Sequence, residues 1–185
     1  MTNQRKNNVP KRRKVNIFQM SWVLRYLLYR VIYSLAGNVY SYCGRPIYHN
    51  GLHKLKVFGS LGIFPSWRIE FLGCGEMHII GNVRIGHNFH AVVGGDVVLE
   101  DGVVIAPDVY LSTHESQLTD IKAPINERPI IAKPIRINEN AFIGKGAMIF
   151  PGVTIGRNAV IGAYAIVKSN VADGEVFASS NLCRR

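Results

Sequence analysis

The C-terminal third of the chain carries an aliphatic residue at every sixth position. These positions are Ile137, Ile143, Ile149, Ile155, Ile161 and Val167. Four residues after each stands a small or β-branched residue, namely Ala141, Ala147, Val153, Ala159, Ala165 and Val171. A helix repeats about every 3.6 residues and a strand about every 2, so neither produces a period of six. The pattern predicts a parallel β-solenoid in which each flat face is one hexad long and directs one aliphatic side chain into a narrow core.

A less regular form of the repeat runs upstream. Its aliphatic positions are Ile79, Ile85, Leu99, Ile105 and Leu111, with a slip of register between residues 91 and 99. The period vanishes over residues 112–136, which contain Pro124, Pro129 and Pro134, and this stretch is predicted to leave the coil as a loop. A β-sandwich of short strands is the alternative fold, and six hexads without a slip disfavour it.

Charge is distributed unevenly along the 185 residues. The chain has 22 Lys and Arg against 12 Asp and Glu, a net charge of +10. Residues 1–69 hold 12 of the basic residues and no acidic one, whereas the remainder is nearly neutral. The three cysteines, Cys43, Cys74 and Cys183, have no metal-ligand or disulfide spacing, and no signal peptide is apparent. We therefore expect a cytoplasmic protein whose basic character belongs to its N-terminal arm.

The N-terminal arm combines a basic tract, residues 6–14, with a mostly apolar segment, residues 17–36. Arg25 and Arg30 interrupt this segment and disfavour a membrane span. On a helical projection its aliphatic residues form one arc, and aromatic and basic residues form the opposite arc. Such a helix suits the surface of an anionic bilayer, which implies a peripheral protein on the inner face of the cell membrane. The alternatives are that the aliphatic face docks on the solenoid or on a neighbouring subunit, or, least favoured, that the arm binds nucleic acid.

His114 is the candidate catalytic residue, because it lies at the root of the predicted loop on a rigid scaffold. An imidazole titrates near neutral pH and can take a proton from an alcohol. His87 and His90 occupy corner or outward positions, and no close second histidine accompanies His114. No metal is therefore predicted. The sequence contains no nucleophile-elbow, Walker or dinucleotide motif.

Residues 143–163, IGKGAMIFPGVTIGRNAVIGA, resemble the signature of the hexapeptide-repeat acyltransferases, the left-handed β-helix class. The resemblance covers roughly residues 79–185 and is greatest to the branch with galactoside, maltose and bacterial surface-polysaccharide O-acetyltransferases. It implies an all-β left-handed parallel β-helix, a homotrimer, and acetyl-CoA as acyl donor.

The resemblance also implies roles for individual residues. It makes His114 the general base. It places Phe142 beside the pantetheine arm, Gly144 and Lys145 beside the thioester, and main-chain groups of Ala163 against the cofactor. The expected cations near coenzyme A are Lys168 and Arg184. Where relatives have an Asn-rich hexad, this chain reads AVVGGD at residues 91–96, so the acceptor pocket is expected to differ.

The predicted organisation has three parts. Residues 1–50 form the basic tail and amphipathic helix, residues 51–172 the β-helix with its loop at 112–136, and residues 173–185 a tail that contributes to the cofactor site. The expected activity is acetyl transfer to a sugar hydroxyl of a bacterial surface polysaccharide or its lipid-linked precursor. Two alternatives remain open: N-acetylation of an amino sugar or antibiotic, and a non-catalytic scaffold in a glycan assembly complex. No nucleic acid partner is expected.

Overall fold

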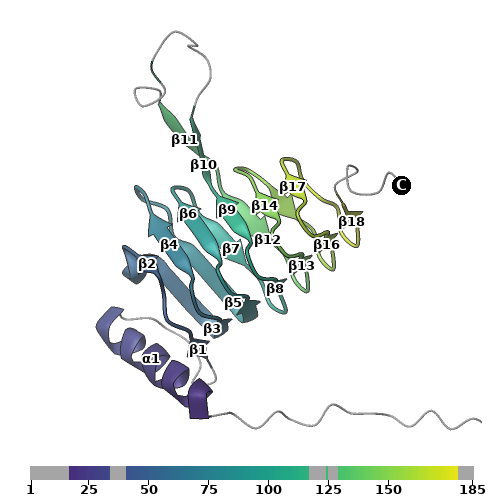
Figure 1. Ribbon diagram of the computed structural model, residues 1–185. Coiled ribbons are helices and arrows are strands. Elements are labelled where there is room, and N and C mark those ends of the chain that lie inside the picture. Colours follow the sequence, from purple (N-terminus) through teal and green to yellow (C-terminus); the bar gives the residue numbers. More distant parts are fainter. Residues whose placement is uncertain (1–16, 34–40, 117–123, 125–128, 179–185) are drawn as a thin grey trace, which may run out of the picture.

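The computed structural model describes residues 17–33, 41–116, 124 and 129–178. One helix is followed by a column of short strands that stack along a single axis (Figure 1). Neighbouring strands on the column are parallel, and the chain forms a left-handed β-helix with one N-terminal helix. This confirms the parallel β-solenoid that the hexad repeat predicts and the left-handed β-helix that the resemblance implies.

The elements follow one another along the chain with short connections. The N-terminal elements are α1 (Ile17–Tyr33), β1 (Tyr42–Cys43), β2 (Tyr48–His49), the 3-10 helix η1 (Leu52–Lys54), β3 (Leu55–Ile63) and β4 (Arg68–Phe71). The central strands are β5 (Met77–Ile85), β6 (His90–Val93), β7 (Val97–Leu99), β8 (Val104–Ile105), β9 (Tyr110–Ser112), β10 (His114–Ser116) and β11 (Ile130–Ala132). The C-terminal strands are β12 (Ile135–Ile137), β13 (Phe142–Ile143), β14 (Met148–Ile149), β15 (Thr154–Ile155), β16 (Val160–Ile161), β17 (Ile166–Val167) and β18 (Val176–Phe177).

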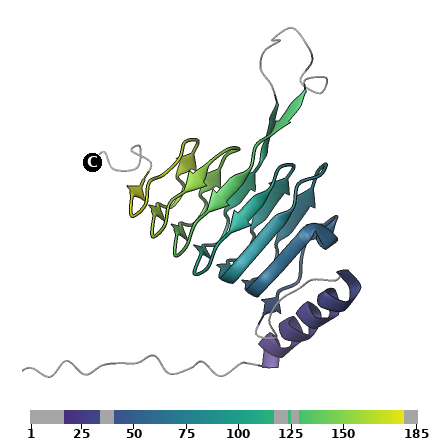
Figure 2. The ribbon, with the colours of Figure 1, turned by 180° about the vertical axis from the view of Figure 1, so that it is seen from behind.

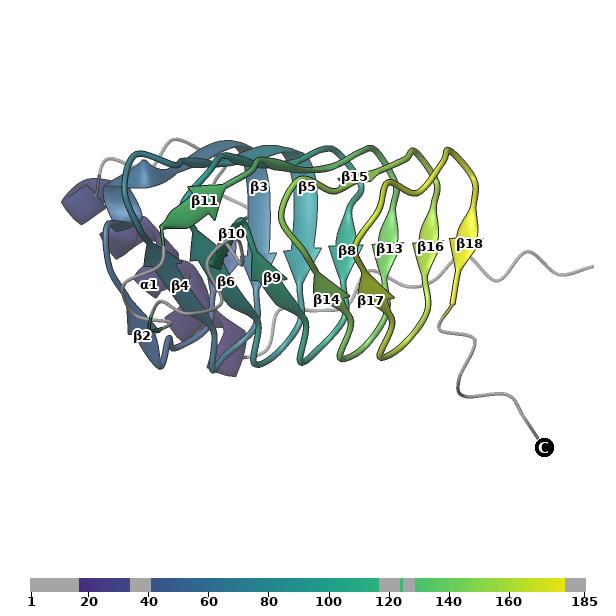
Figure 3. The ribbon, with the colours of Figure 1, turned by 90° about the horizontal axis from the view of Figure 1, so that it is seen from above.

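The column has three faces. The first contains β1, β8, β13, β16 and β18, the second β2, β4, β6, β9, β14 and β17, and the third β7, β12 and β15. The stacking of strands on the first face is visible from above (Figure 3). Each coil visits the third, first and second faces in turn, so the chain makes a corner after every hexad.

Two long strands join the third face to the first. β3 and β5 each span nine residues, and β5 pairs with β7 through its beginning and with β8 through its end. Gly81 lies where β5 turns this corner, with φ of 78°. A Cβ there would lie 2.2 Å from Oδ1 of Asp101, so both the backbone angle and the space require glycine.

The core is the stack of inward side chains that the repeat predicts. All six aliphatic hexad positions from Ile137 to Val167, and all six of their fourth-position partners, are buried. The upstream aliphatic positions are buried as well. These predictions are confirmed. Because each inward side chain lies directly above its equivalent in the next coil, the core is one continuous apolar column.

The interruption of the repeat forms a projecting arm. Its root is an antiparallel pair of strands, β10 and β11, in which His114 lies opposite Ala132. The arm stands out from the side of the column (Figures 1 and 2). The sequence pattern indicated a loop over 112–136, and the structure adds that both ends of this loop are strand. Within the arm, residues 117–123 and 125–128 lie outside the described residues.

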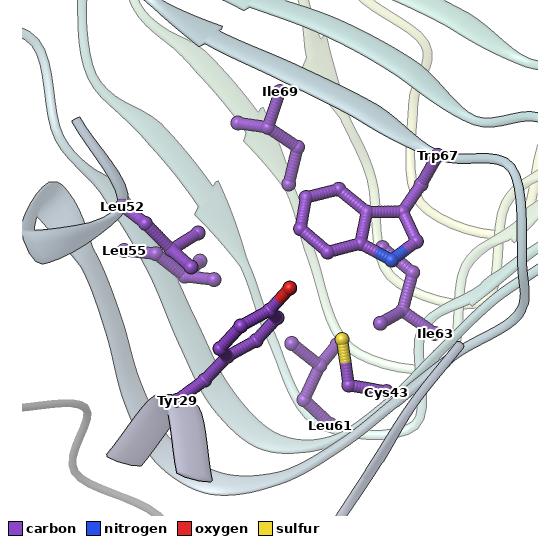
Figure 4. Close-up of a pocket in the computed structure, with 8 residues that line it drawn as sticks. All are labelled: Tyr29, Cys43, Leu52, Leu55, Leu61, Ile63, Trp67 and Ile69. Atoms are coloured by element: carbon purple, nitrogen blue, oxygen red, sulfur yellow. The ribbon is translucent and has the colours of Figure 1, made fainter. Parts of the chain in front are cut away.

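Helix α1 packs on the N-terminal end of the column through its aromatic face. Tyr26 is buried, and the Trp22 ring meets the Phe64 ring edge-on at 5.7 Å between centroids. Tyr29 points into a small apolar cavity under the helix, lined by Cys43 and Trp67 among others (Figure 4). The helix therefore does not dock on the column of its own chain by its aliphatic face, which was one of the alternatives. Within the described residues, no helix has the length and apolarity that crossing a bilayer requires.

Candidate active site

His114 begins strand β10, directly after the end of the second face. The coil below holds its backbone, since the Thr113 N–H donates to the Val92 carbonyl at 3.0 Å. The Lys133 N–H in turn donates to the Thr113 carbonyl at 2.7 Å, which ties the returning strand of the arm to the same place. The imidazole is half-buried and lines a surface hollow. Its position is fixed by the column and not by the arm alone.

The hydroxyl of Ser112 orients the imidazole. Ser112 is buried, and its Oγ lies 3.0 Å from the His114 carbonyl oxygen and 3.3 Å from Nδ1 of the ring. A hydroxyl has one proton, and here it is donated to the carbonyl. Its lone pair is then available to accept from Nδ1–H. The Ser112 hydroxyl thus favours the neutral tautomer that carries its proton on Nδ1, in which Nε2 has the lone pair of a base.

Thr113 connects the histidine to the neighbouring turn. Its side chain is fully buried, and Oγ1 accepts hydrogen bonds from the N–H groups of Gly94 at 2.7 Å and Gly95 at 2.9 Å. The same hydroxyl donates to the Val92 carbonyl at 3.2 Å. The turn at residues 94–95 and the strand that carries His114 are therefore held as one unit.

The hollow beside His114 is mostly apolar and is open to solvent. It is lined by Leu72, Gly73, Gly94, His114, Ile130 and Ala132. A Cβ on Gly94 would make ordinary contacts, 3.5 Å from Cβ of Ala132 and 3.6 Å from Cβ of His114. The glycine is therefore not required by the backbone, and its effect is to leave room next to the imidazole. His114 forms part of the wall of this hollow, and among the described residues its Nε2 has no hydrogen-bond partner.

A carboxylate often orients a catalytic imidazole, but Glu115, Asp96 and Asp108 each have another partner. Glu115 pairs with Lys133 at 2.6 Å. Asp96 accepts from the Glu76 N–H at 3.0 Å. Asp108 accepts a hydrogen bond from the Asn88 amide at 3.0 Å. This bond, together with the ammonium group of Lys145, lowers the pKa of the Asp108 carboxyl group. Among the described residues no carboxylate pairs with the imidazole, and the serine hydroxyl takes that place.

The residues that the resemblance assigns to the thioester lie together on the edge between the first and second faces. Gly144 follows β13, and a Cβ there would lie 2.7 Å from the Ala163 nitrogen of the next coil. The Gly144 N–H donates to the Ile161 carbonyl at 2.8 Å and is committed to the ladder. Within the described part of the chain, the Lys145 N–H has no acceptor. Phe142 lies on the adjoining face, 42% exposed and in register with Val160.

His114 and Lys168 lie on a different edge, the one between the second and third faces. Lys168 follows β17, and its Nζ lies 5.3 Å from the centroid of the Phe150 ring. Arg184 lies outside the described residues. Within one chain, therefore, the second face of the column separates the imidazole from the free N–H of Lys145.

The described residues contain no group of three or more His, Cys, Asp or Glu side chains that could hold a metal ion. His90 pairs with Glu70 at 3.0 Å, and the His87 ring packs on Phe64 at 4.9 Å between centroids. Both histidines thus have partners of their own on the column surface.

The repeat segment matches a known protein family. Residues 134–169 match a family described as bacterial transferase hexapeptide, six repeats. This segment carries the bacterial transferase hexapeptide repeat. No curated protein matches the chain.

Solved structures resemble the whole fold. The N-acyltransferase AntD from Bacillus cereus, in complex with dTDP and 3-hydroxybutyryl-CoA, superposes with a TM-score of 0.70 at 15% identity, covering 84% of this chain and 83% of that chain. The hexapeptide-repeat acetyltransferase VCA0836 from Vibrio cholerae, complexed with acetyl-CoA, gives a TM-score of 0.59 at 22% identity, covering 85% and 73%. At these identities the likeness establishes the fold.

Sequence reasoning missed Ser112 and Thr113. The two residues directly precede His114 in the sequence, and two consecutive hydroxyl side chains before a histidine were the available signal. Side chains alternate between the two sides of a strand, so the position where β9 ends decides which hydroxyl faces the His114 ring and which faces the turn at residues 94–95. The sequence pattern does not define where β9 ends.

Proposed function

We propose that this protein transfers the acetyl group of acetyl-CoA to a hydroxyl of a carbohydrate, with His114 as general base. The observation that carries the proposal is a half-buried imidazole at the wall of an open hollow, with Nδ1 3.3 Å from the Ser112 hydroxyl and no hydrogen-bond partner for Nε2 among the described residues. The hexapeptide repeat and the two CoA-bound structural neighbours support a CoA thioester as donor.

The reaction proceeds by direct attack. Nε2 of His114 takes the proton of the acceptor hydroxyl while its oxygen forms a bond to the thioester carbonyl carbon, a contribution of about 10²–10⁴-fold in rate. The Lys145 N–H donates to the developing oxyanion, worth roughly 3–4 kcal/mol. The carbon–sulfur bond then breaks, and the imidazolium returns its proton to the departing thiolate. Acetyl ester and coenzyme A are the products.

The site is completed by a second copy of the chain in a homotrimer. The separation of His114 and Lys145 onto different edges supports this arrangement, because adjacent copies can bring the two edges together. The residues proposed to contact coenzyme A are Phe142, Gly144, Lys145, Ala163, Lys168 and Arg184. Gly144 contributes close approach of the backbone, since its N–H is already bonded.

The proposed acceptor is a bacterial surface polysaccharide or its lipid-linked precursor, made on the cytoplasmic face of the membrane. An amino sugar is the second candidate, because the neighbour AntD is an N-acyltransferase and a mutant of it was solved with dTDP-4-amino-4,6-dideoxyglucose and coenzyme A. A hydroxyl and an amine need the same base, so the described residues do not separate the two. The scaffold alternative predicts no binding of coenzyme A by calorimetry.

The test is the rate of thiol release from acetyl-CoA in the presence of a panel of glycans and amino sugars. His114→Ala is expected to lower the rate by about 10²-fold or more. Activity within tenfold of the unmodified protein would remove His114 as the base. Arg184→Ala is expected to raise the KM for acetyl-CoA, and an unchanged KM would exclude contact with the cofactor phosphates.

A further inference from the structure

Helix α1 presents a continuous aliphatic strip to solvent. The exposed fractions are 63% for Met20, 68% for Leu24, 37% for Leu27, 54% for Leu28 and 82% for Val31. These residues stand at i, i+4, i+7, i+8 and i+11, the spacing of one helical face. Single exposed apolar residues are ordinary, but an ordered strip of this length marks an interaction surface.

The opposite face of α1 already has its partner. Trp22, Arg25, Tyr26 and Tyr29 stand at i, i+3, i+4 and i+7, and they face the first coils. At about 100° per residue, the centres of the two faces are about 170° apart. Packing on the column therefore fixes the rotation of the helix about its axis and leaves the aliphatic strip exposed. The helix itself lies at the N-terminal end of the column (Figure 1).

The charge of the flanking sequence indicates what the strip contacts. Residues 1–16 carry six Lys and Arg and no Asp or Glu, directly before the first turn of α1. An aliphatic strip next to a cluster of cations is typical of a helix that lies in the interface of an anionic membrane. Each cation near such a surface strengthens binding about fivefold. A second copy of the strip fits less well, since self-pairing would bring two equally basic tails together.

We infer that the aliphatic strip of α1 is a membrane-docking surface for anionic phospholipid. The aliphatic side chains enter the boundary between headgroups and acyl chains, and the preceding cations contact lipid phosphates. The aromatic face meanwhile keeps the column attached to the helix. The surface is separate from the hollow at His114, so docking does not depend on acyl transfer. It does rest on the proposed function for its purpose, since lipid-linked glycans lie at this boundary.

The test is flotation of the full chain with vesicles of phosphatidylcholine alone and of phosphatidylcholine with about 30% phosphatidylglycerol. Binding to the anionic vesicles alone, weakened at high salt, is expected. Leu24→Glu with Leu28→Glu is expected to reduce binding at least tenfold. The matched control is Phe58→Glu with Ile80→Glu, a cross-strand pair on the column that is 60% and 43% exposed and makes the same change in charge.

Three outcomes would overturn the inference. The first is equal binding of both double variants, which would assign the effect to net charge. The second is unchanged binding of the α1 variant. The third is a smaller oligomer in light scattering for the α1 variant alone, which would make the strip an interface between copies. Acetyl transfer to a soluble acceptor, measured on the same variants, keeps failure of docking distinct from failure of the proposed function.

Discussion

Replacement of Ser112 by alanine tests the orientation of the imidazole. The change removes the acceptor of Nδ1–H at 3.3 Å and the donor to the His114 carbonyl at 3.0 Å. One neutral hydrogen bond contributes about 0.5–1.5 kcal/mol, which corresponds to a fall in kcat of about 2- to 13-fold. This is well below the loss expected for His114→Ala, because the base is still present and only its positioning is impaired.

The assay is steady-state release of coenzyme A with acetyl-CoA and the best acceptor found. Ser112→Ala should lower kcat and leave the KM for acetyl-CoA unchanged, since the hydrogen bonds of the buried Ser112 hydroxyl are made with His114 and not with a residue proposed to contact the cofactor. Ser116→Ala is the matched control, because it removes a half-buried hydroxyl from β10, the strand that His114 begins, at the same distance of two residues from His114. Thermal melting of both variants monitors the fold.

Two results would refute this reasoning. A kcat for Ser112→Ala equal to that of Ser116→Ala would show that the hydroxyl does not position the ring. A raised KM with unchanged kcat would place Ser112 in binding instead. Rescue of kcat by Ser112→Thr, which restores a hydroxyl, is the expected complement.

The packing around Gly94, Ile143 and Cys43 determines how each responds to substitution or to a reagent. Gly94→Ala should raise the KM for the acceptor with little change in melting temperature, since the added methyl makes only ordinary contacts while filling the hollow; a large loss of stability would contradict this. Ile143→Ala should lower the free energy of unfolding by about 2–5 kcal/mol in denaturant titration, because its side chain is fully buried. Burial raises the pKa of the Cys43 thiol to about 12, so a thiol reagent at pH 8 should label exposed Cys74 and leave Cys43 unlabelled until the chain is denatured, as peptide mapping by mass spectrometry would show.

The architecture could be predicted from the sequence because the hexad period reports the core directly. Ile155 and Ala159, for example, are buried for the same geometric reason as their equivalents one coil away, so each hexad repeats the evidence of the last. The long strands β3 and β5 were beyond this reasoning. In these strands the chain passes from one face to the next within a single strand, at Gly59 of β3 and Gly81 of β5. The spacing of apolar residues does not mark this corner.

The candidate site was predictable only in part. His114 could be located because it stands where the repeat stops, and the arm begins beside it as expected. The residue that orients His114 could not be located, because an acidic residue that is close in the sequence does not have to point toward the imidazole. Glu115 adjoins the histidine, yet it faces Lys133 across the arm, whereas the hydroxyl two residues earlier faces the ring.

Attachment of α1 to the first coil also restricts how the N-terminal segment can be studied. A stack of coils ends in an apolar cross-section, and here the helix shields Leu52, Cys43 and Trp67 at that end. Deleting the N-terminal segment would uncover this cross-section and invite aggregation. Aggregated protein would be missing from the floating fraction, just as a protein that no longer binds lipid would be. Single substitutions on the outer surface of the helix leave the cross-section sealed, and they are the cleaner route to its role.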